Sequence, residues 1–144
     1  MTSIDFYISE STYTRIRELL ACRLSEKACQ TNAATYIHTQ TEQHSQQLDK
    51  LLWNFKEHSF IPHKLYHHEN TEKHPQPVLI GHNIEPEKNF DLLINLDNKI
   101  PDFYSRFKRV IEIVSNDKEQ RDLSRQHYKF YKDRGYHINT HHIK

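Results

Sequence analysis

The segment DLLINLDNKIPDFYSRFKRVIEIV, residues 91–114, is the most informative part of this sequence for its fold. Its two ends, 91–96 and 109–114, are apolar runs bounded by polar residues, a pattern typical of strands buried on both faces of a sheet. A short helical turn at 102–107 is expected to connect them. Residues 91–114 therefore predict two central strands of an α/β sheet.

Strand and helix patterns alternate along the rest of the chain as well. Further strands are expected at 5–8, 34–38, 60–65 and 78–82, with 136–140 as an edge strand or an ordered tail, and 67–77 is expected to be a polar surface loop. Helices are expected from the apolar stripe that starts at Ile16 to about Gln30, from a capping box of Thr39 and Glu42 through Phe55, and from Asn116 as N-cap to Arg134. Gly135 follows the last helix, where a C-terminal glycine commonly ends it. This alternation predicts one domain, 1–144, with a three-layer, mostly parallel sheet and helices on both faces.

The composition limits the kinds of partner. The chain has 20 Lys and Arg against 19 Asp and Glu, a net charge of +1, so it is not expected to bind polyanions over its whole surface. Any nucleic-acid affinity would have to come from a local patch. The first ten residues do not resemble a signal peptide, and no run approaches the roughly 18 apolar residues of a membrane span. Cys22 and Cys29 do not form a disulfide framework, so a cytoplasmic location is expected.

Enzymatic function is not expected. A nucleotide-binding turn after the first strand needs glycine, but the residues there are Ser9-Glu10-Ser11-Thr12-Tyr13, and neither Gly81 nor Gly135 starts a helix. The two cysteines fall in the middle of a helix, which is typical of packing residues. Asp91 and Asp97 flank a strand and are interpreted as caps or turn residues. The sequence therefore predicts no nucleotide-binding loop and no catalytic group.

The 12 histidines do not predict a metal site. Two sets could be considered, one at 137, 141 and 142 and one at 63, 67 and 68. Neither set includes a cysteine, a glutamate in register or the helical spacing of an HExxH motif. They are interpreted as surface residues, and no metal or other cofactor is expected.

Two aromatic residues lie off the apolar stripe of their helices. Trp53 points about 140° from Leu48 at roughly 100° per residue, and the apolar segment 59–63 follows it. Trp53 could pack beneath a neighbouring loop, or it could be an exposed interface anchor, a role in which tryptophan is enriched.

The last helix gives the sharper signal. By the same angular count, its inner side carries Leu123, His127, Phe130 and the stem of Arg134, and its opposite half carries Arg121, Arg125, Tyr128, Lys129 and Lys132. A charged outer face is usually only solvated. However, like charges four residues apart on a helix repel each other. The spacing of Arg121, Arg125 and Lys129 therefore favours an anionic ligand that neutralises them. Arginines beside an aromatic ring and an apolar strand end at Val114 suit a peptide with acidic residues and an aromatic C-terminus.

The sequence resembles the chi subunit family of bacterial DNA polymerase III. The residues that carry the resemblance are LW at 52–53, SFIPH at 59–63, PVLI at 77–80, DLLINL at 91–96, RVIEIV at 109–114, Arg125, YK at 128–129, Tyr131 and RGY at 134–136. The resemblance covers essentially the whole chain. It implies a Rossmann-like fold without a nucleotide site, no catalysis, and an accessory role in the clamp loader. It also implies two protein partners, the psi subunit and the acidic, phenylalanine-ended tail of single-stranded DNA-binding protein.

The resemblance also implies which residues bind each partner. The tail site is carried over to Val114, Arg121, Arg125, Tyr128, Lys129 and the segment near Ile138. Trp53, Phe60 and Pro62 are assigned to the psi subunit, or to a helicase that some chi proteins engage instead. The alternative is a single-stranded nucleic-acid-binding module, with the basic helix on phosphates and Tyr128 stacked on a base.

Overall fold

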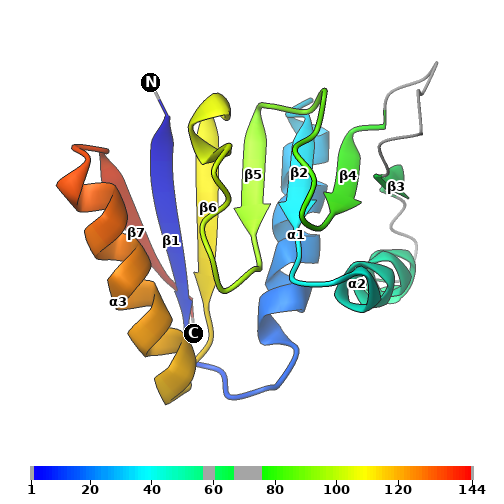
Figure 1. Cartoon of the computed structure of the whole chain (residues 1–144). Helices are drawn as coiled ribbons and strands as arrows, with labels where there is room; N and C mark the ends of the chain where they lie inside the picture. The colour runs from blue at the N-terminus through cyan, green and yellow to red at the C-terminus, as the bar shows by residue number, and fades with distance from the viewer. Residues whose placement is uncertain (1, 57–60, 67–75, 144) are drawn as a thin grey trace.

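The computed structural model describes residues 2–56, 61–66 and 76–143, and Figure 1 shows them as one sheet flanked by helices. The strands are β1 (Ser3–Ser9), β2 (Thr35–His38), β3 (His63–Leu65), β4 (Val78–Gly81), β5 (Leu92–Asn95), β6 (Arg109–Val114) and β7 (Ile138–Ile143). The helices are α1 (Ile16–Gln30), α2 (Glu42–Asn54) and α3 (Lys118–Asp133), with the 3-10 turn η1 at Tyr104–Arg106.

The seven-stranded sheet has the order β3-β4-β2-β5-β6-β1-β7, and each pair of neighbours is parallel. The strands expected from 91–96 and 109–114 are the central pair β5 and β6, with Leu92 opposite Arg109. The expected turn between them is η1. The predicted α/β class and its parallel sheet are confirmed. The sheet is more regular than predicted, because every strand pair in the described part of the chain is parallel.

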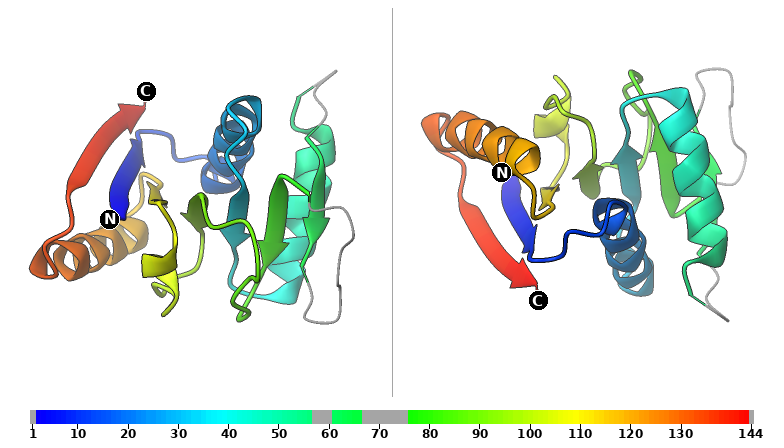
Figure 2. Two further views of the ribbon diagram at one scale, coloured as in Figure 1. Left: turned by 90° about the horizontal axis from the view of Figure 1, so that it is seen from above. Right: turned by 90° about the horizontal axis from the view of Figure 1, so that it is seen from below.

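Helices cover both faces of the sheet, as predicted. Helices α1 and α2 pack on one face over an aliphatic cluster that includes Ile37, Ile80, Ile94 and Ile111. On the other face, α3 and η1 pack over a largely aromatic cluster that includes Phe6, Tyr36, Tyr104, Phe107 and Tyr131. Figure 2 shows α1 and α3 on opposite sides of the strands. Burying each large apolar side chain contributes about 1.5–3 kcal/mol relative to leaving it in water, so both clusters hold the layers together.

Two predicted helix caps are wrong. The N-cap of α2 is Thr41, whose Oγ1 accepts a hydrogen bond from the amide of His44 at 3.1 Å. Thr39 is buried instead, and its hydroxyl pairs with that of Ser45. The N-cap of α3 is Asp117, which accepts from the amide of Gln120 at 2.9 Å. Thr39 is unavailable as a cap because it is buried, and Asn116 uses its side chain to donate from Nδ2 to the carbonyl of Glu10 at 2.9 Å.

The end of α3 and the positions of β3 and β7 agree with the sequence patterns. The segment expected at 136–140 is the edge strand β7, which pairs in parallel with β1. Gly135 follows α3 with φ 81°, a left-handed conformation that glycine adopts without strain. The strand expected at 60–65 is β3, which begins at His63. Phe60, the first residue of the expected strand, lies outside the described residues, as does most of the expected loop at 67–77.

Candidate binding surfaces

A buried carboxylate holds α3 against the sheet. Glu112 of β6 is 5% exposed, and it accepts hydrogen bonds from His127 Nδ1 at 3.0 Å, from the Tyr131 hydroxyl at 2.8 Å and from Asn95 Nδ2 at 3.1 Å. Three separate donors therefore satisfy this one acid, which would otherwise be costly to bury. Two of them come from α3, so Glu112 fixes the rotation of that helix on the sheet.

The inner side of α3 differs from the predicted one. His127 is buried as predicted, but the second buried residue is Tyr131. Leu123 and Phe130 are only half-buried. Arg134 is exposed, and its guanidinium lies 3.5 Å from the centre of the Phe130 ring. The physical reason is the Tyr131 hydroxyl, which finds its hydrogen-bond acceptor in Glu112 and so can point into the aromatic cluster.

His127 carries a proton on both ring nitrogens. Its Nδ1 faces the Glu112 carboxylate, and its Nε2 lies 2.9 Å from the carbonyl oxygen of Asn98. Because both partners only accept hydrogen bonds, both nitrogens must donate. Burial opposes the charged ring, but the hydrogen bond to Glu112 and its charge outweigh burial and raise the pKa of His127. The ring and Glu112 form a buried ion pair at this end of β6.

We expect the stability of the fold to fall as the pH rises through the raised pKa of His127. The folded protein binds this proton more tightly than the unfolded chain, so its contribution is complete below about pH 6.5 and is lost above that value. The pKa of His38 is lowered by burial, and His38 acts in the opposite sense below about pH 6.5. Urea unfolding from about pH 6.5 to about pH 9 measures the effect. His127→Gln should flatten this dependence, and an unchanged slope in that variant would contradict the assignment.

The exposed side of α3 carries the predicted basic residues. Arg121, Arg125 and Lys129 are exposed and follow one another at intervals of four residues. Tyr128 is 39% exposed, and the centre of its ring lies 5.7 Å from that of Phe6 on β1. At roughly 100° per residue, Tyr128 lies only about 80° from the middle of the buried side. Tyr128 thus sits on the side of α3 that faces β1, and it does not project straight into solvent.

Two of the basic side chains have acidic partners on the same helix. Arg125 Nη1 lies 3.2 Å from Asp122 Oδ1, and Lys129 Nζ lies 2.9 Å from Asp133 Oδ2. Arg121 has no carboxylate partner in the described part of the chain, and its Nε donates to the backbone carbonyl of Asp117 at 3.4 Å. Exposed pairs of this kind contribute about 0–1 kcal/mol. These cations can therefore exchange their partners for another anion at little cost.

The other two residues of the predicted tail site lie beneath α3 at its two ends. Val114 is 3% exposed and contacts the same small cavity as Leu123 and Ser124 in the first turns of the helix. Ile138 is half-buried at the start of β7. Through β1, Val114 and Ile138 are four residues apart in register, which is about 13 Å along the strands. The structure brings Arg121, Arg125, Tyr128 and Lys129 together on α3. Val114 lies toward the beginning of this helix and Ile138 toward its end.

The second predicted surface lies at the end of α2. Trp53 is 51% exposed, and its ring centre is 4.6 Å from that of His63, the buried first residue of β3. His63 Nε2 lies 3.1 Å from Asp49 Oδ1 on α2, and Pro62 next to it is half-buried. Trp53 is therefore half-exposed and packs against a buried side chain. Phe60 lies outside the described residues.

The described residues contain neither a cluster of metal-ligating side chains nor a helix that could span a membrane. Within 2–56, 61–66 and 76–143, no three His, Cys, Asp or Glu side chains are grouped so that they could hold a metal ion. In the same ranges, none of the helices has the length and the apolar character needed to cross a bilayer.

A family model and three related proteins that match this chain all have the same family description. The family model of the DNA polymerase III chi subunit, HolC, matches residues 1–139. The DNA polymerase III subunit chi of Pseudomonas aeruginosa is 36% identical over 143 residues, which cover 99% of this chain and 98% of that protein. The subunits chi of Haemophilus influenzae and Escherichia coli are 28% and 27% identical, over 96% and 97% of this chain and the same shares of those proteins.

Two solved structures have the same fold. T4 UvsW superposes with a TM-score of 0.69 at 11% identity, and domain 2 of the DEAD-box helicase Mss116p, bound to an RNA duplex, with 0.66 at 12%. Both alignments cover 99% of this chain, but the chain spans only 41% and 64% of those two structures. At such low identity the likeness shows the Rossmann-like fold alone.

Proposed function

The chain belongs to the family of DNA polymerase III chi subunits, and from this premise we propose that it is a non-catalytic adaptor between two replication proteins. The family places it among the accessory subunits of the replicative polymerase. The adaptor would join the psi subunit to the acidic C-terminal tail of single-stranded DNA-binding protein, in the bacterial cytoplasm. The observation that carries the proposal is the exposed row of Arg121, Arg125 and Lys129 beside Tyr128.

The chemistry of this row suits an acidic peptide that ends in phenylalanine. Arg121 and Arg125 are one turn apart on α3, a spacing of about 5–6 Å between Cβ atoms. Two guanidinium groups at this spacing can hold two carboxylates, since each pairs with a carboxylate through parallel hydrogen bonds. The Tyr128 ring, supported by Phe6, offers an aromatic surface for the terminal phenylalanine. Basic charge and an aromatic platform on one side of a helix thus match both features of the tail.

The proposal is tested by measuring which ligand the protein prefers. We expect a fluorescent peptide ending in Asp-Phe to bind with a micromolar dissociation constant, measured by anisotropy. The same peptide ending in Asp-Ala should bind more weakly, because it cannot use the Tyr128 ring. A short oligo-dT strand that bound as tightly as the Asp-Phe peptide would overturn the adaptor proposal in favour of the single-stranded nucleic-acid-binding module.

For the second partner we propose the surface around Trp53 and Pro62, and we assign Phe60 to the same partner from the sequence alone. Tryptophan is one of the residues most enriched among the hot spots of protein interfaces, and a supported ring is already held in place for binding. Trp53 has this support, because His63 under its ring is itself buried and close to Asp49. The surface lies on α2 and β3, at the opposite end of the sheet from α3 (Figure 1). Both partners could therefore bind at once, either psi or a helicase at Trp53 and the tail at α3.

We expect Trp53→Ala to weaken binding of the psi subunit by about 30-fold or more, the effect of removing an interface hot spot of about 2 kcal/mol. Trp53 is the single tryptophan of the chain, so its fluorescence should also shift when a tryptophan-free psi variant is added. The matched control is binding of the tail peptide, which Trp53→Ala should leave unchanged. An unaltered emission spectrum at saturating psi would contradict the assignment.

A further inference from the structure

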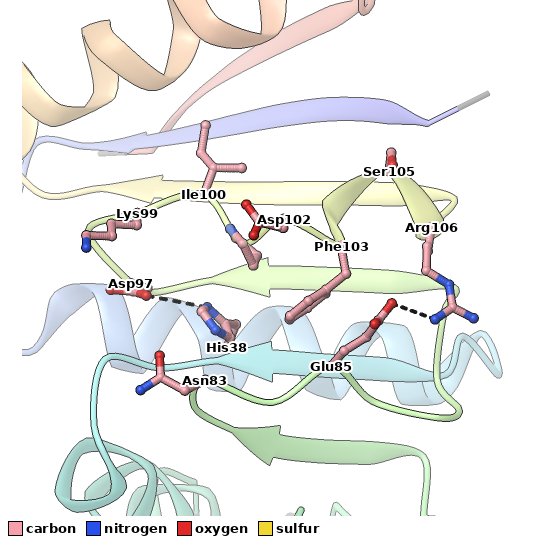
Figure 3. A pocket seen from close by; sticks show the side chains of 11 residues that line it. His38, Asn83, Glu85, Asp97, Lys99, Ile100, Asp102, Phe103, Ser105 and Arg106 are labelled. Atoms are coloured by element: carbon pink, nitrogen blue, oxygen red, sulfur yellow. Dashed lines mark hydrogen bonds and ion pairs between the residues drawn. The ribbon is translucent and has the colours of Figure 1, made fainter.

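A cavity of about 610 Å³ lies at the carboxyl ends of β2 and β5, on the face of the sheet that also carries η1 (Figure 3). From β2 the chain continues to β3 on one side, and from β5 it continues to β6 on the other. Such a divergence between neighbouring parallel strands is where α/β sheets commonly bind ligands. The volume also falls in the range of about 300–1,000 Å³ that is typical of ligand sites. The cavity is separate from α3 and from Trp53.

Three residues in register across the sheet orient the groups at the base of this cavity. His38 of β2 lies opposite Asn95 of β5, which lies opposite Glu112 of β6. Asn95 Nδ2 donates to Glu112 Oε2 and to the carbonyl of Lys99, both at 3.1 Å. This fixes the amide so that its Oδ1 faces His38 Nδ1 at 3.3 Å. The buried carboxylate that anchors α3 therefore also sets the orientation of Asn95.

Asn95 in turn determines which nitrogen of His38 carries the proton. Nδ1 has two acceptors near it, Asn95 Oδ1 and, at 3.8 Å, Asp97 Oδ2, so Nδ1 is the donor. Burial lowers the pKa of His38 below its usual value of about 6.5, so at neutral pH the uncharged ring prevails and its Nε2 has a free lone pair. The side chain is only 4% exposed, it lines the cavity, and its Nε2 has no hydrogen-bond partner among the described residues. His38 therefore offers the cavity an acceptor that a donor of a ligand can reach.

The other walls add acceptors and an aromatic ring. Asp97 and Asp102 bring two carboxylates, and the ring of Phe103 stands edge-on to His38 with 5.6 Å between centres. Arg106 and Glu85 neutralise each other through an ion pair at the far end, which Figure 3 shows. Lys99 is the remaining cation of the lining. Two carboxylates and a neutral imidazole against one amine favour a ligand that is positively charged and rich in donors.

We propose that this cavity receives the guanidinium group of an arginine side chain presented by a protein partner. A guanidinium is flat, carries five N–H donors and stacks on aromatic rings. It can therefore donate to Nε2 of His38 and to a carboxylate while its plane packs against Phe103. The cavity has no glycine-rich turn and presents carboxylates, so it does not suit a phosphate. Lys99, Asp102 and Ser105 are exposed, so the mouth opens at the protein surface, where a partner's side chain can enter.

The test is a titration of the ¹⁵N-labelled protein with the tripeptide acetyl-Gly-Arg-Gly-amide, followed by NMR. We expect shifts centred on the amides of residues 97–103, and at least tenfold weaker binding of the same peptide with citrulline, which has the same shape without the charge. Equal binding of both peptides would overturn the proposal. Free arginine that bound as tightly as the tripeptide would keep the guanidinium site but overturn a protein partner as its source.

Two exposed residues of the lining allow variants with opposite expected effects. Asp102→Asn should weaken binding of the arginine peptide several-fold, and Lys99→Gln should strengthen it, because the first removes an attractive charge and the second a repulsive one. Asp133→Asn is the matched control, since it makes the same change of charge on α3 and should leave the affinity unaltered. If Asp102→Asn and Asp133→Asn had the same effect, binding would depend only on the net charge of the protein, and the proposal would fail.

Discussion

Replacing Glu112 by alanine is expected to lower the free energy of unfolding by about 3–5 kcal/mol. The substitution leaves three buried donors without an acceptor, one each on His127, Tyr131 and Asn95. It also leaves the charged His127 ring without its counter-ion. Since domains of this size are stable by only about 5–15 kcal/mol, the variant should lose a large fraction of its stability. Urea denaturation followed by circular dichroism measures the change.

Glu87→Ala is the matched control for this prediction. Glu87 is exposed, and no ion pair of its carboxylate is seen in the described part of the chain, so its removal should change the stability by less than about 0.5 kcal/mol. If Glu112→Ala unfolded at the same urea concentration as Glu87→Ala, Glu112 could not be the group that fixes α3. A loss of stability that disappeared above the pKa of His127 would instead show that only the ion pair matters.

Periodicity in the sequence was sufficient to predict the sheet. The runs at 91–96 and 109–114 are apolar over their whole length because β5 and β6 are covered on both faces, and this property is local and visible. The caps could not be predicted in the same way. Thr39 and Thr41 are equally able to cap a helix, and the choice between them depends on whether Thr39 is buried against Ser45. That contact belongs to the tertiary structure.

The rotation of α3 was predicted only in part for a related reason. A helical count treats Tyr131 as one aromatic residue among several, and it treats Glu112 as a single polar interruption of an apolar strand. The burial of each residue depends on the other, because the hydroxyl of Tyr131 donates a hydrogen bond to the carboxylate of Glu112. A glutamate within a run such as RVIEIV is the signal that could have shown this. Such a residue can be buried only if donors from another element reach it.

The spacing of basic residues predicted the surface of α3, but no pattern predicted the cavity at β2 and β5. Arg121, Arg125 and Lys129 are four residues apart, so any helix brings them to one side. The cavity is built from the end of β2 and two loops, with His38 and Phe103 contributed from distant parts of the sequence. Only the polar residues that end two apolar strands, His38 and Asn95, hint at it from the sequence.

Arg125→Ala is expected to weaken binding of the Asp-Phe tail peptide by about 10-fold to 100-fold, since hydrogen bonds between charged groups contribute about 1.5–3 kcal/mol. The reason is its place in the middle of the basic row, one turn from both Arg121 and Lys129 and next to Tyr128. Fluorescence anisotropy with the labelled peptide measures the loss. The fold should be unaffected, because Arg125 is exposed and its only described ion pair is with Asp122 on the same helix.

Asp122→Asn should change the same affinity in the opposite direction. In the free protein Asp122 Oδ1 lies 3.2 Å from Arg125 Nη1, so the peptide has to replace this carboxylate before it can bind Arg125. Asp122 also repels the acidic residues of the peptide. Removing its charge should tighten binding several-fold, and this gain should be lost in the double variant Asp122→Asn with Arg125→Ala. A gain of the same size without Arg125 would mean that Asp122 acts only through the overall charge of α3, and it would remove the specific role that the spacing of this helix assigns to Arg125.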